Sequence, residues 1–122
     1  MAVRGRGGAV VALAGCPNVG KSTLFNALTG LHQHTGNWAG KTVAVARGRC
    51  RRGGREWTLV DLPGTYSLLT RSAEEETARD FLCFGGAAGA VVVCDASCLE
   101  RGLSLALQVL EQIGRASCRE RV

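Results

Sequence analysis

Short apolar runs alternate with helix-like segments from the start of the chain. The run Ala9 to Ala14 is rich in valine and flanked by glycines, which is typical of a strand buried on both faces of a parallel sheet. After a glycine-rich loop, the positions of Leu24, Phe25 and Leu28 fit one face of a helix. Gly30 stands where such a helix would end. The chain is therefore predicted to begin as strand, loop and helix.

The middle of the chain reads as a loop followed by a hairpin. Leu31 to Lys41 has no periodicity and is predicted to be a surface loop. Thr42 to Arg51 alternates, which indicates a strand with four side chains on one face: Val43, Val45, Arg47 and Arg49. Gly53-Gly54 then makes a two-residue turn into the strand Glu56 to Val60. These two strands are expected to be antiparallel.

The second half adds helix, strand and helix. Ser72 is expected to cap a helix with acidic residues in its first turn and an inner face of Ala78, Phe81 and Leu82. Ala90 to Cys94 is an apolar strand that ends at Asp95, and an amphipathic helix follows from Leu99, with apolar positions Leu103, Leu105, Ala106, Leu107, Val109 and Leu110. The order β, α, β, β, α, β, α predicts an α/β domain with a mostly parallel sheet, helices on both faces and one antiparallel hairpin. Ligands are expected at the carboxyl ends of its strands.

The loop after the first strand carries the strongest chemical signal. Gly15, Gly20, Lys21 and Ser22 match the phosphate-binding P-loop pattern G-x-x-x-x-G-K-S, with a strand before it and a helix after it. Glycines let backbone N–H groups curl around a phosphate, and the helix N-terminus adds a positive dipole. We expect Lys21 to reach the β and γ phosphates and Ser22 to offer its hydroxyl to Mg²⁺.

Two further positions fit a nucleotide site. Asp61-x-x-Gly64 follows the predicted strand Glu56 to Val60, and a carboxylate there can hold the magnesium shell while the Gly64 N–H meets the γ-phosphate. Thr42 follows the predicted loop and could close over Mg²⁺. Each of these positions also has an ordinary interpretation, as a turn aspartate or a strand threonine.

Length and composition set limits on the class of protein. The chain has 122 residues, 46% of them hydrophobic, which suits one globular domain. Its longest stretches without a charged residue or a histidine, 7–20 and 81–94, have 14 residues each, fewer than the roughly 20 that a membrane-spanning helix needs. The first eight residues show no signal-peptide pattern.

The formal charge of +5 comes mostly from three groups of arginines, Arg4 and Arg6; Arg47, Arg49, Arg51 and Arg52; and Arg115, Arg119 and Arg121. No aromatic residues lie between them, so solvated arginines are favoured over a nucleic-acid surface. The six cysteines form no CxxC pair, and His32 and His34 lie far in sequence from four of them. Buried free thiols in a reducing compartment are therefore expected rather than a zinc site.

Four ordered stretches together resemble one known family. They are GCPNVGKSTLFNALTG, TGNWAGKTV, DLPGTYSL and DASCLERGLSLALQVLE. In this order they resemble the N-terminal G domain of the ferrous iron transporter B (FeoB) family, over Val10 to Gln112. The resemblance implies a P-loop GTPase on the cytoplasmic face of a bacterial membrane protein, coupled to Fe²⁺ uptake. GTP or GDP, Mg²⁺ and the transporter's own membrane domain are then the expected ligands and partner.

The resemblance also assigns roles by position. Nucleotide contacts are expected at Gly15, Cys16, Pro17, Asn18, Val19, Gly20, Lys21, Ser22, Thr23, Asp61, Leu62, Pro63 and Gly64. Catalytic roles are expected for Asn18, Lys21, Thr42 and Gly64, and Mg²⁺ contacts for Ser22, Thr42 and Asp61. Asn18 would help to hold K⁺ together with the backbone carbonyls of Gly36 and Trp38.

Two positions depart from related patterns. Thr65 stands where Ras-like proteins carry a water-positioning glutamine, which predicts slow intrinsic hydrolysis. Cys16 stands where the family usually has asparagine, and its side chain is expected to point away from the phosphates. The strand with the guanine-reading N/T-K/M-x-D motif is not found before the end of the sequence, so guanine specificity rests on the resemblance alone.

The last ten residues, 113–122, end the apolar pattern and are polar and basic. The DNA string ATC GGA AGA GCG TCG TGT AGG GAA AGA GTG, which is that of a common sequencing-library adapter, translates to these ten residues, and we hypothesise that the natural reading frame continues into it. We therefore divide the chain into an N-terminal extension (1–8), a partial G domain (9–112) and a read-through tail (113–122), with a genuine basic tail as the alternative. Without residues 113–122, the chain has 12 lysines and arginines against 9 aspartates and glutamates.

Two alternative functions remain open from the sequence. One is a soluble Era-like GTPase that acts on ribosomal RNA, for which Arg47 to Arg55 would be the contact surface. The other is a nucleotide-dependent interaction module without catalysis. The stretch GNWAGKT favours the transporter domain over the Era-like GTPase, and a GTP hydrolysis assay separates the interaction module from both.

Overall fold

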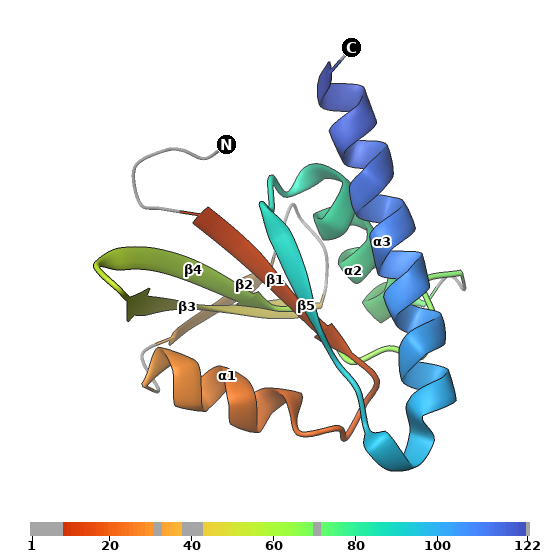
Figure 1. The fold of residues 1–122 in the computed structure, drawn as a ribbon, viewed down its shortest axis with the longest axis horizontal. Helices are drawn as coiled ribbons and strands as arrows, with labels where there is room; N and C mark the ends of the chain where they lie inside the picture. The colour runs from red at the N-terminus through yellow and green to blue at the C-terminus, as the bar shows by residue number, and fades with distance from the viewer. Residues whose placement is uncertain (1–8, 31–32, 38–42, 70–71, 122) are drawn as a thin grey trace.

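The computed structural model describes residues 9–30, 33–37, 43–69 and 72–121, and one mixed sheet forms its centre. In chain order the elements are β1 (Ala9–Gly15), α1 (Lys21–Thr29), β2 (Gln33–Asn37), β3 (Ala44–Arg52), β4 (Arg55–Asp61), α2 (Ala73–Phe84), β5 (Gly89–Val93), the one-turn 3₁₀ helix η2 (Ala96–Cys98) and α3 (Leu99–Arg121). The strand order is β2-β3-β4-β1-β5. Helix α1 lies on one face of the sheet, and α2 and α3 lie together on the other (Figure 1). The predicted α/β class with helices on both faces is confirmed.

The central strand β1 fixes the rest of the sheet. It pairs in parallel with β4 on one side and with β5 on the other, so the carboxyl ends of all three strands meet at one edge. Successive side chains of a strand point to opposite faces. Leu13 therefore packs with Phe25 under α1, while Ala12 and Ala14 pack with Leu105 and other residues under α2 and α3. This alternation is why the sheet has two small cores.

The region predicted to be a loop contains a strand. Gln33–Asn37 forms β2, which pairs antiparallel with β3 at the edge of the sheet. The sequence QHTGN is polar and does not alternate, so it gave no strand signal. Pairing with the exposed edge of β3 makes the strand, and this is a tertiary effect rather than a local preference.

The predicted hairpin is present. β3 and β4 are antiparallel, with Arg52 opposite Arg55, and both turn glycines have positive φ: +57° at Gly53 and +78° at Gly54. Such a turn needs residues that tolerate the left-handed region at both positions. Arg47, Arg49 and Arg51 of this hairpin are exposed, as expected for solvated arginines.

Helix α2 begins as predicted at Ser72. The Ser72 hydroxyl accepts a hydrogen bond from the Glu75 N–H at 3.2 Å, and the Glu75 carboxylate accepts one from the Ser72 N–H at 3.3 Å. This reciprocal capping satisfies N–H groups that have no partner inside the helix. Phe81 and Leu82 are buried on the inner face, as expected.

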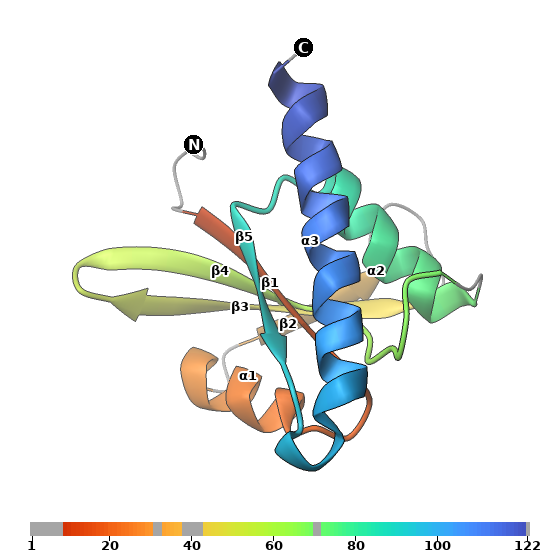
Figure 2. The ribbon, with the colours of Figure 1, turned by 45° about the vertical axis from the view of Figure 1, so that its right-hand side comes forward.

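Helix α3 differs from the prediction in two ways. Leu105 and Val109 are buried, but Leu103, Leu107 and Leu110 are more than half exposed, so the apolar face is only partly covered. The helix also continues to Arg121 through the expected break after residue 112, because arginine, alanine and glutamate are good helix formers. Figure 2 shows α3 crossing the sheet beside α2, with its last turns beyond the edge of the sheet. Among the described residues, no helix has the length and apolar character of a membrane span.

Candidate functional site

The P-loop encloses a cavity at the carboxyl end of β1. The cavity has a volume of about 380 Å³ and is lined by Cys16, Pro17, Asn18, Val19, Gly20, Lys21, Ser22, Thr23 and Gly64. Small-molecule sites usually measure about 300 to 1,000 Å³. The structure thus brings together, around one space, most of the residues predicted to contact nucleotide.

The backbone geometry at three positions of the P-loop explains which residues stand there. A Cβ atom on Gly15 would lie 2.9 Å from the Val93 carbonyl oxygen, so the close approach of β1 and β5 excludes any side chain there. Gly20 has φ of +87° and Asn18 has φ of +63°. Glycine and asparagine are the residues that adopt this left-handed region at least cost. The residue types at these three positions therefore favour the observed conformation of the loop.

The first turn of α1 faces the cavity with its N–H groups. Its N-cap is Gly20, which offers no side-chain acceptor, and no acidic residue lies in the first turn. The first backbone bond of the helix runs from the Leu24 N–H to the Gly20 carbonyl at 3.1 Å. The open N–H groups and the positive end of the helix dipole favour an anion at this place.

Lys21 is buried and held by the segment that follows β4. Its ammonium group forms an ion pair with the Asp61 carboxylate and donates a hydrogen bond to the Leu62 carbonyl at 2.8 Å. Lys21 and Asp61 were predicted to lie in one site, but their ion pair was not predicted. The Asp61 carboxylate thus neutralises the charge of the buried Lys21 ammonium group next to the cavity.

The segment Leu62–Gly64 runs directly against the P-loop. The Leu62 N–H donates to the Leu13 carbonyl at 3.0 Å, and the Thr65 N–H donates to the Gly15 carbonyl at 3.1 Å. A Cβ on Gly64 would lie 3.1 Å from the Cα of Pro17, so the two backbones are in contact. The predicted Asp61-x-x-Gly64 motif is therefore part of the P-loop site.

Residues after Gly64 connect the site to α2 and α3. The Gln108 side-chain oxygen accepts hydrogen bonds from the Leu68 N–H at 2.6 Å and from the Ser67 hydroxyl at 3.2 Å. The Arg79 guanidinium donates to the Leu68 carbonyl at 2.5 Å. Gln108 and Arg79 were not predicted, because each lies on a helix far along the chain and no motif marks it.

Two of the predicted metal ligands, Thr42 and Trp38, lie outside the described residues. Gly36 lies in β2, opposite Val45, at the far edge of the sheet. Three strand spacings separate β2 from β1, the strand that leads into the P-loop, which is roughly 14 Å across the sheet.

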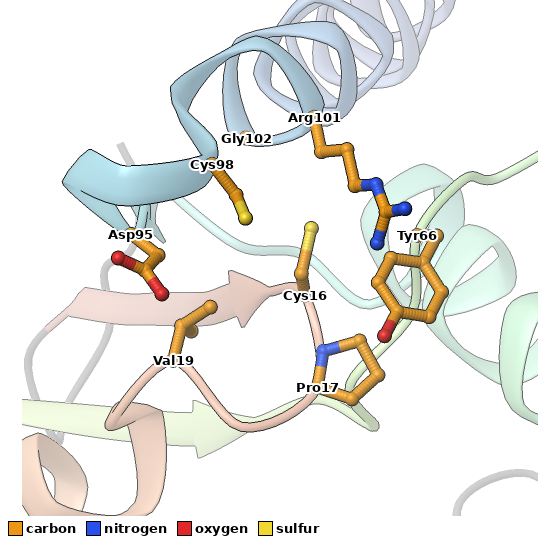
Figure 3. Close-up of a pocket in the computed structure, with 8 residues that line it drawn as sticks. All are labelled: Cys16, Pro17, Val19, Tyr66, Asp95, Cys98, Arg101 and Gly102. Carbon is orange, nitrogen blue, oxygen red and sulfur yellow. The ribbon is translucent and has the colours of Figure 1, made fainter.

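A second, smaller cavity lies behind the P-loop and was not predicted. It measures about 90 Å³ and is lined by Cys16, Pro17, Val19, Tyr66, Asp95, Cys98, Arg101 and Gly102 (Figure 3). Burial raises the pKa of the Cys16 thiol, and the nearby Cys94 thiol adds to this effect. Hydrogen bonds from the Ser97 backbone N–H and hydroxyl lower the pKa of Asp95. The expected burial of the thiols holds for Cys16 and Cys50, whereas Cys98 is exposed.

Comparison with known proteins identifies the family. The family model described as ferrous iron transport protein B matches residues 9–116. The chain is 48% identical over 101 residues to the Fe(2+) transporter FeoB of Methanocaldococcus jannaschii, with 83% of this chain and 15% of the relative covered. It is 50% identical over 105 residues to the FeoB of Escherichia coli K12, covering 83% and 14%. The chain therefore spans about one seventh of these relatives.

Solved structures agree with this assignment. The crystal structure of the G domain of the T. maritima FeoB iron transporter superposes with a TM-score of 0.81 at 49% identity, covering 85% of this chain and 65% of that one. The GMPPNP form of the T. maritima cytosolic domain gives a TM-score of 0.80 at 50% identity, covering 84% and 41%. These matches do not favour an Era-like protein. With its P-loop cavity and the fold of a P-loop GTPase G domain, the chain belongs to the ferrous iron transport protein B family.

Proposed function

We propose that this chain binds GTP and GDP in the P-loop cavity and hydrolyses GTP slowly. The observation that carries the proposal is the P-loop cavity, in which the open N-terminus of α1 lies beside the buried Lys21 ammonium group. Relatives about half identical to this chain have been solved in GDP and GMPPNP forms, which supports the same ligands here.

In this proposal Lys21 and Asp61 exchange partners when nucleotide binds. Lys21 turns from Asp61 to the β and γ phosphates, and the Asp61 carboxylate becomes available to the water shell of Mg²⁺. Ser22 is exposed in the first turn of α1, where its hydroxyl suits a Mg²⁺ ligand. Oxygen donors of this kind fit magnesium. Thr42 is proposed as a further ligand from sequence alone.

The residues proposed for catalysis orient the reacting groups and form no covalent bond with the substrate. The Gly64 N–H is proposed to contact the γ-phosphate, and the close packing of Gly64 on Pro17 sets its position relative to the loop. Thr65 is buried and its backbone N–H is bound to Gly15, so its side chain is not free to orient an attacking water. Slow intrinsic turnover is the expected consequence.

We also propose that K⁺ stimulates hydrolysis through Asn18. A cation beside the phosphates supplies charge as an arginine finger does, an effect worth about 10³ to 10⁵ in rate. Turnover measured in KCl should exceed turnover in NaCl, and Asn18→Gly should remove the difference, since glycine keeps the left-handed backbone and removes the amide. Equal rates in both salts would contradict this role. Gly36 and Trp38 remain proposals from the resemblance.

For the whole protein we propose a cytoplasmic GTPase domain that couples GTP hydrolysis to Fe²⁺ uptake through the transporter's membrane domain. The names of the relatives support iron transport.

The deciding experiment is a titration of the chain with GTP, GDP and ATP, followed by a GTP hydrolysis assay. Binding of GTP and GDP with slow release of phosphate is expected. Binding without any hydrolysis would favour a nucleotide-dependent interaction module, and failure to bind either guanine nucleotide would contradict the proposal.

A further inference from the structure

Two cysteine thiols line the smaller cavity behind the P-loop. Cys16 and Cys98 both line it, one from the end of β1 and one from the turn that begins α3. Figure 3 shows their sulfur atoms pointing toward each other across the cavity. Both cysteines are free thiols.

A third thiol, Cys94, lies next to this pair but does not line the cavity. Gly15 is opposite Val93 in the parallel pairing of β1 and β5, so the following residues, Cys16 and Cys94, leave the two strands side by side. A Cβ on Gly102 would lie 2.7 Å from the Cys94 sulfur, which places Cys94 against the first turns of α3. The described residues contain no group of three or more metal-ligating side chains placed to hold an ion.

We propose that Cys16 and Cys98 are a redox-active thiol pair that a hydroperoxide oxidises to a disulfide. Cys98 is the entry point because it is exposed, whereas Cys16 is buried. Arg101 and Asp95 line the same cavity with opposite charges, and the Arg101 guanidinium is the group there that favours a thiolate. The cavity of about 90 Å³ has room for hydrogen peroxide, since a water molecule occupies about 30 Å³ in the liquid.

The chemistry takes two balanced steps. The Cys98 sulfur attacks one oxygen of hydrogen peroxide, the O–O bond breaks, and Cys98 sulfenic acid and water form. The Cys16 sulfur then attacks the sulfenic sulfur, so that the S–S bond forms, the S–O bond breaks and a second water leaves with the Cys16 proton. Two thiols are oxidised, one peroxide is reduced, and no other reagent is needed.

The disulfide acts on the P-loop because Cys16 belongs to both cavities. A disulfide holds its two Cα atoms within about 7 Å of each other, so oxidation ties the P-loop to the start of α3. Phosphate binding depends on the positions of the loop N–H groups to about 0.5 Å. We therefore expect the oxidised chain to bind nucleotide more weakly. This consequence rests on the proposed nucleotide binding, whereas the formation of the disulfide does not.

The test treats the reduced chain with hydrogen peroxide and maps its disulfides by peptide mass spectrometry. The expected product has lost two hydrogen atoms and contains one bond, Cys16 to Cys98. Cys98→Ser and Cys16→Ser should each abolish it, and the matched control Cys94→Ala should retain it. A bond from Cys94, a mixture of bonds that includes Cys50 or Cys83, or no bond at all would overturn the proposal.

The second measurement is nucleotide affinity before and after oxidation. GDP affinity should fall by about tenfold or more, given the tolerance of such a site, and a dithiol reductant should restore it. Cys98→Ser should bind GDP normally and show no response to peroxide. Equal affinities of the reduced and the disulfide-bonded chain would overturn the regulatory role. If even the reduced chain fails to bind GDP, the proposed function fails, while the mass spectrum still decides whether the thiol pair reacts.

Discussion

At the scale of single residues, the P-loop site depends on a few side chains and backbone angles. Lys21 is the one buried cation among the described side chains, and its partners Asp61 and Leu62 come from a different strand. The sequence predicted these residues as one site because the P-loop spacing is local and the carboxyl ends of parallel strands meet. It did not predict the Lys21–Asp61 pairing, because the pairing depends on how far β1 and β4 are offset.

Replacing Lys21 should remove nucleotide binding. Lys21→Ala deletes the cation proposed to contact the β and γ phosphates, and charged hydrogen bonds of this kind are worth about 10²-fold or more in affinity. Isothermal titration with GTP and GDP measures the loss. Arg55→Ala, which removes an exposed cation from the hairpin, serves as the control and should bind normally. Unchanged GTP affinity in Lys21→Ala would refute the phosphate role.

Replacing Gly64 should separate triphosphate from diphosphate binding. The Cβ of Gly64→Ala would press on the Pro17 backbone at 3.1 Å and move the N–H proposed to meet the γ-phosphate. We expect affinity for a non-hydrolysable GTP analogue to fall by about tenfold, as for the loss of one or two hydrogen bonds, and GDP affinity to change less. Gly89→Ala is the control, because nothing lies within 4 Å of its added Cβ. Equal losses for both nucleotides would show that Gly64 does not sense the γ-phosphate.

At the scale of elements, α3 connects the smaller cavity to the core. Its first turns pack on Cys94 through Gly102, its middle holds Leu68 through Gln108, and Leu105 and Val109 fill the space under α2. The apolar periodicity predicted the helix, but not which of its leucines are buried. That choice depends on where α2 lies, which the pattern of one helix does not contain.

Adding one methyl group to α3 should show how tightly it packs. In an open helix position Gly→Ala stabilises by about 1 kcal/mol. Gly102→Ala should instead destabilise by about 1 to 3 kcal/mol, because its Cβ would lie 2.7 Å from the Cys94 sulfur and 2.8 Å from the Cys94 Cβ.

Urea unfolding of four proteins measures this effect: the parent, Gly102→Ala, Cys94→Ala and the double variant. Part of the loss should be recovered in the Cys94→Ala background, where the sulfur is gone. A stabilised Gly102→Ala protein would mean that α3 does not lie this close to β5.

At the scale of the whole molecule, the chain is a small part of the relatives that it matches. It covers 15% of the M. jannaschii transporter and 65% of the T. maritima G-domain chain. Family membership comes from comparison of the whole sequence, and no single cavity or helix would establish it.

Recovery of the source gene tests the proposed place of this domain. The natural reading frame downstream of residue 112 should encode the guanine-reading motif and then several apolar spans of about 20 residues each. A short reading frame with no such spans would contradict the transporter assignment. The same clone tests the origin of residues 113–122, since an independent copy with the same ten codons would show a genuine basic tail.

The sequence by itself determined the P-loop, the hairpin turn at Gly53-Gly54 and the capped start of α2, because each depends on residues adjacent in the chain and on backbone angles that few residue types adopt. Only the tertiary structure decided three other features. β2 exists because β3 offers it an edge, Lys21 meets Asp61 because β1 and β4 are in register, and Cys16 meets Cys98 because α3 begins beside the end of β1. The contacts of Lys21 with Asp61 and of Cys16 with Cys98 join residues 40 or more positions apart, and local sequence carries no record of how such segments pack together.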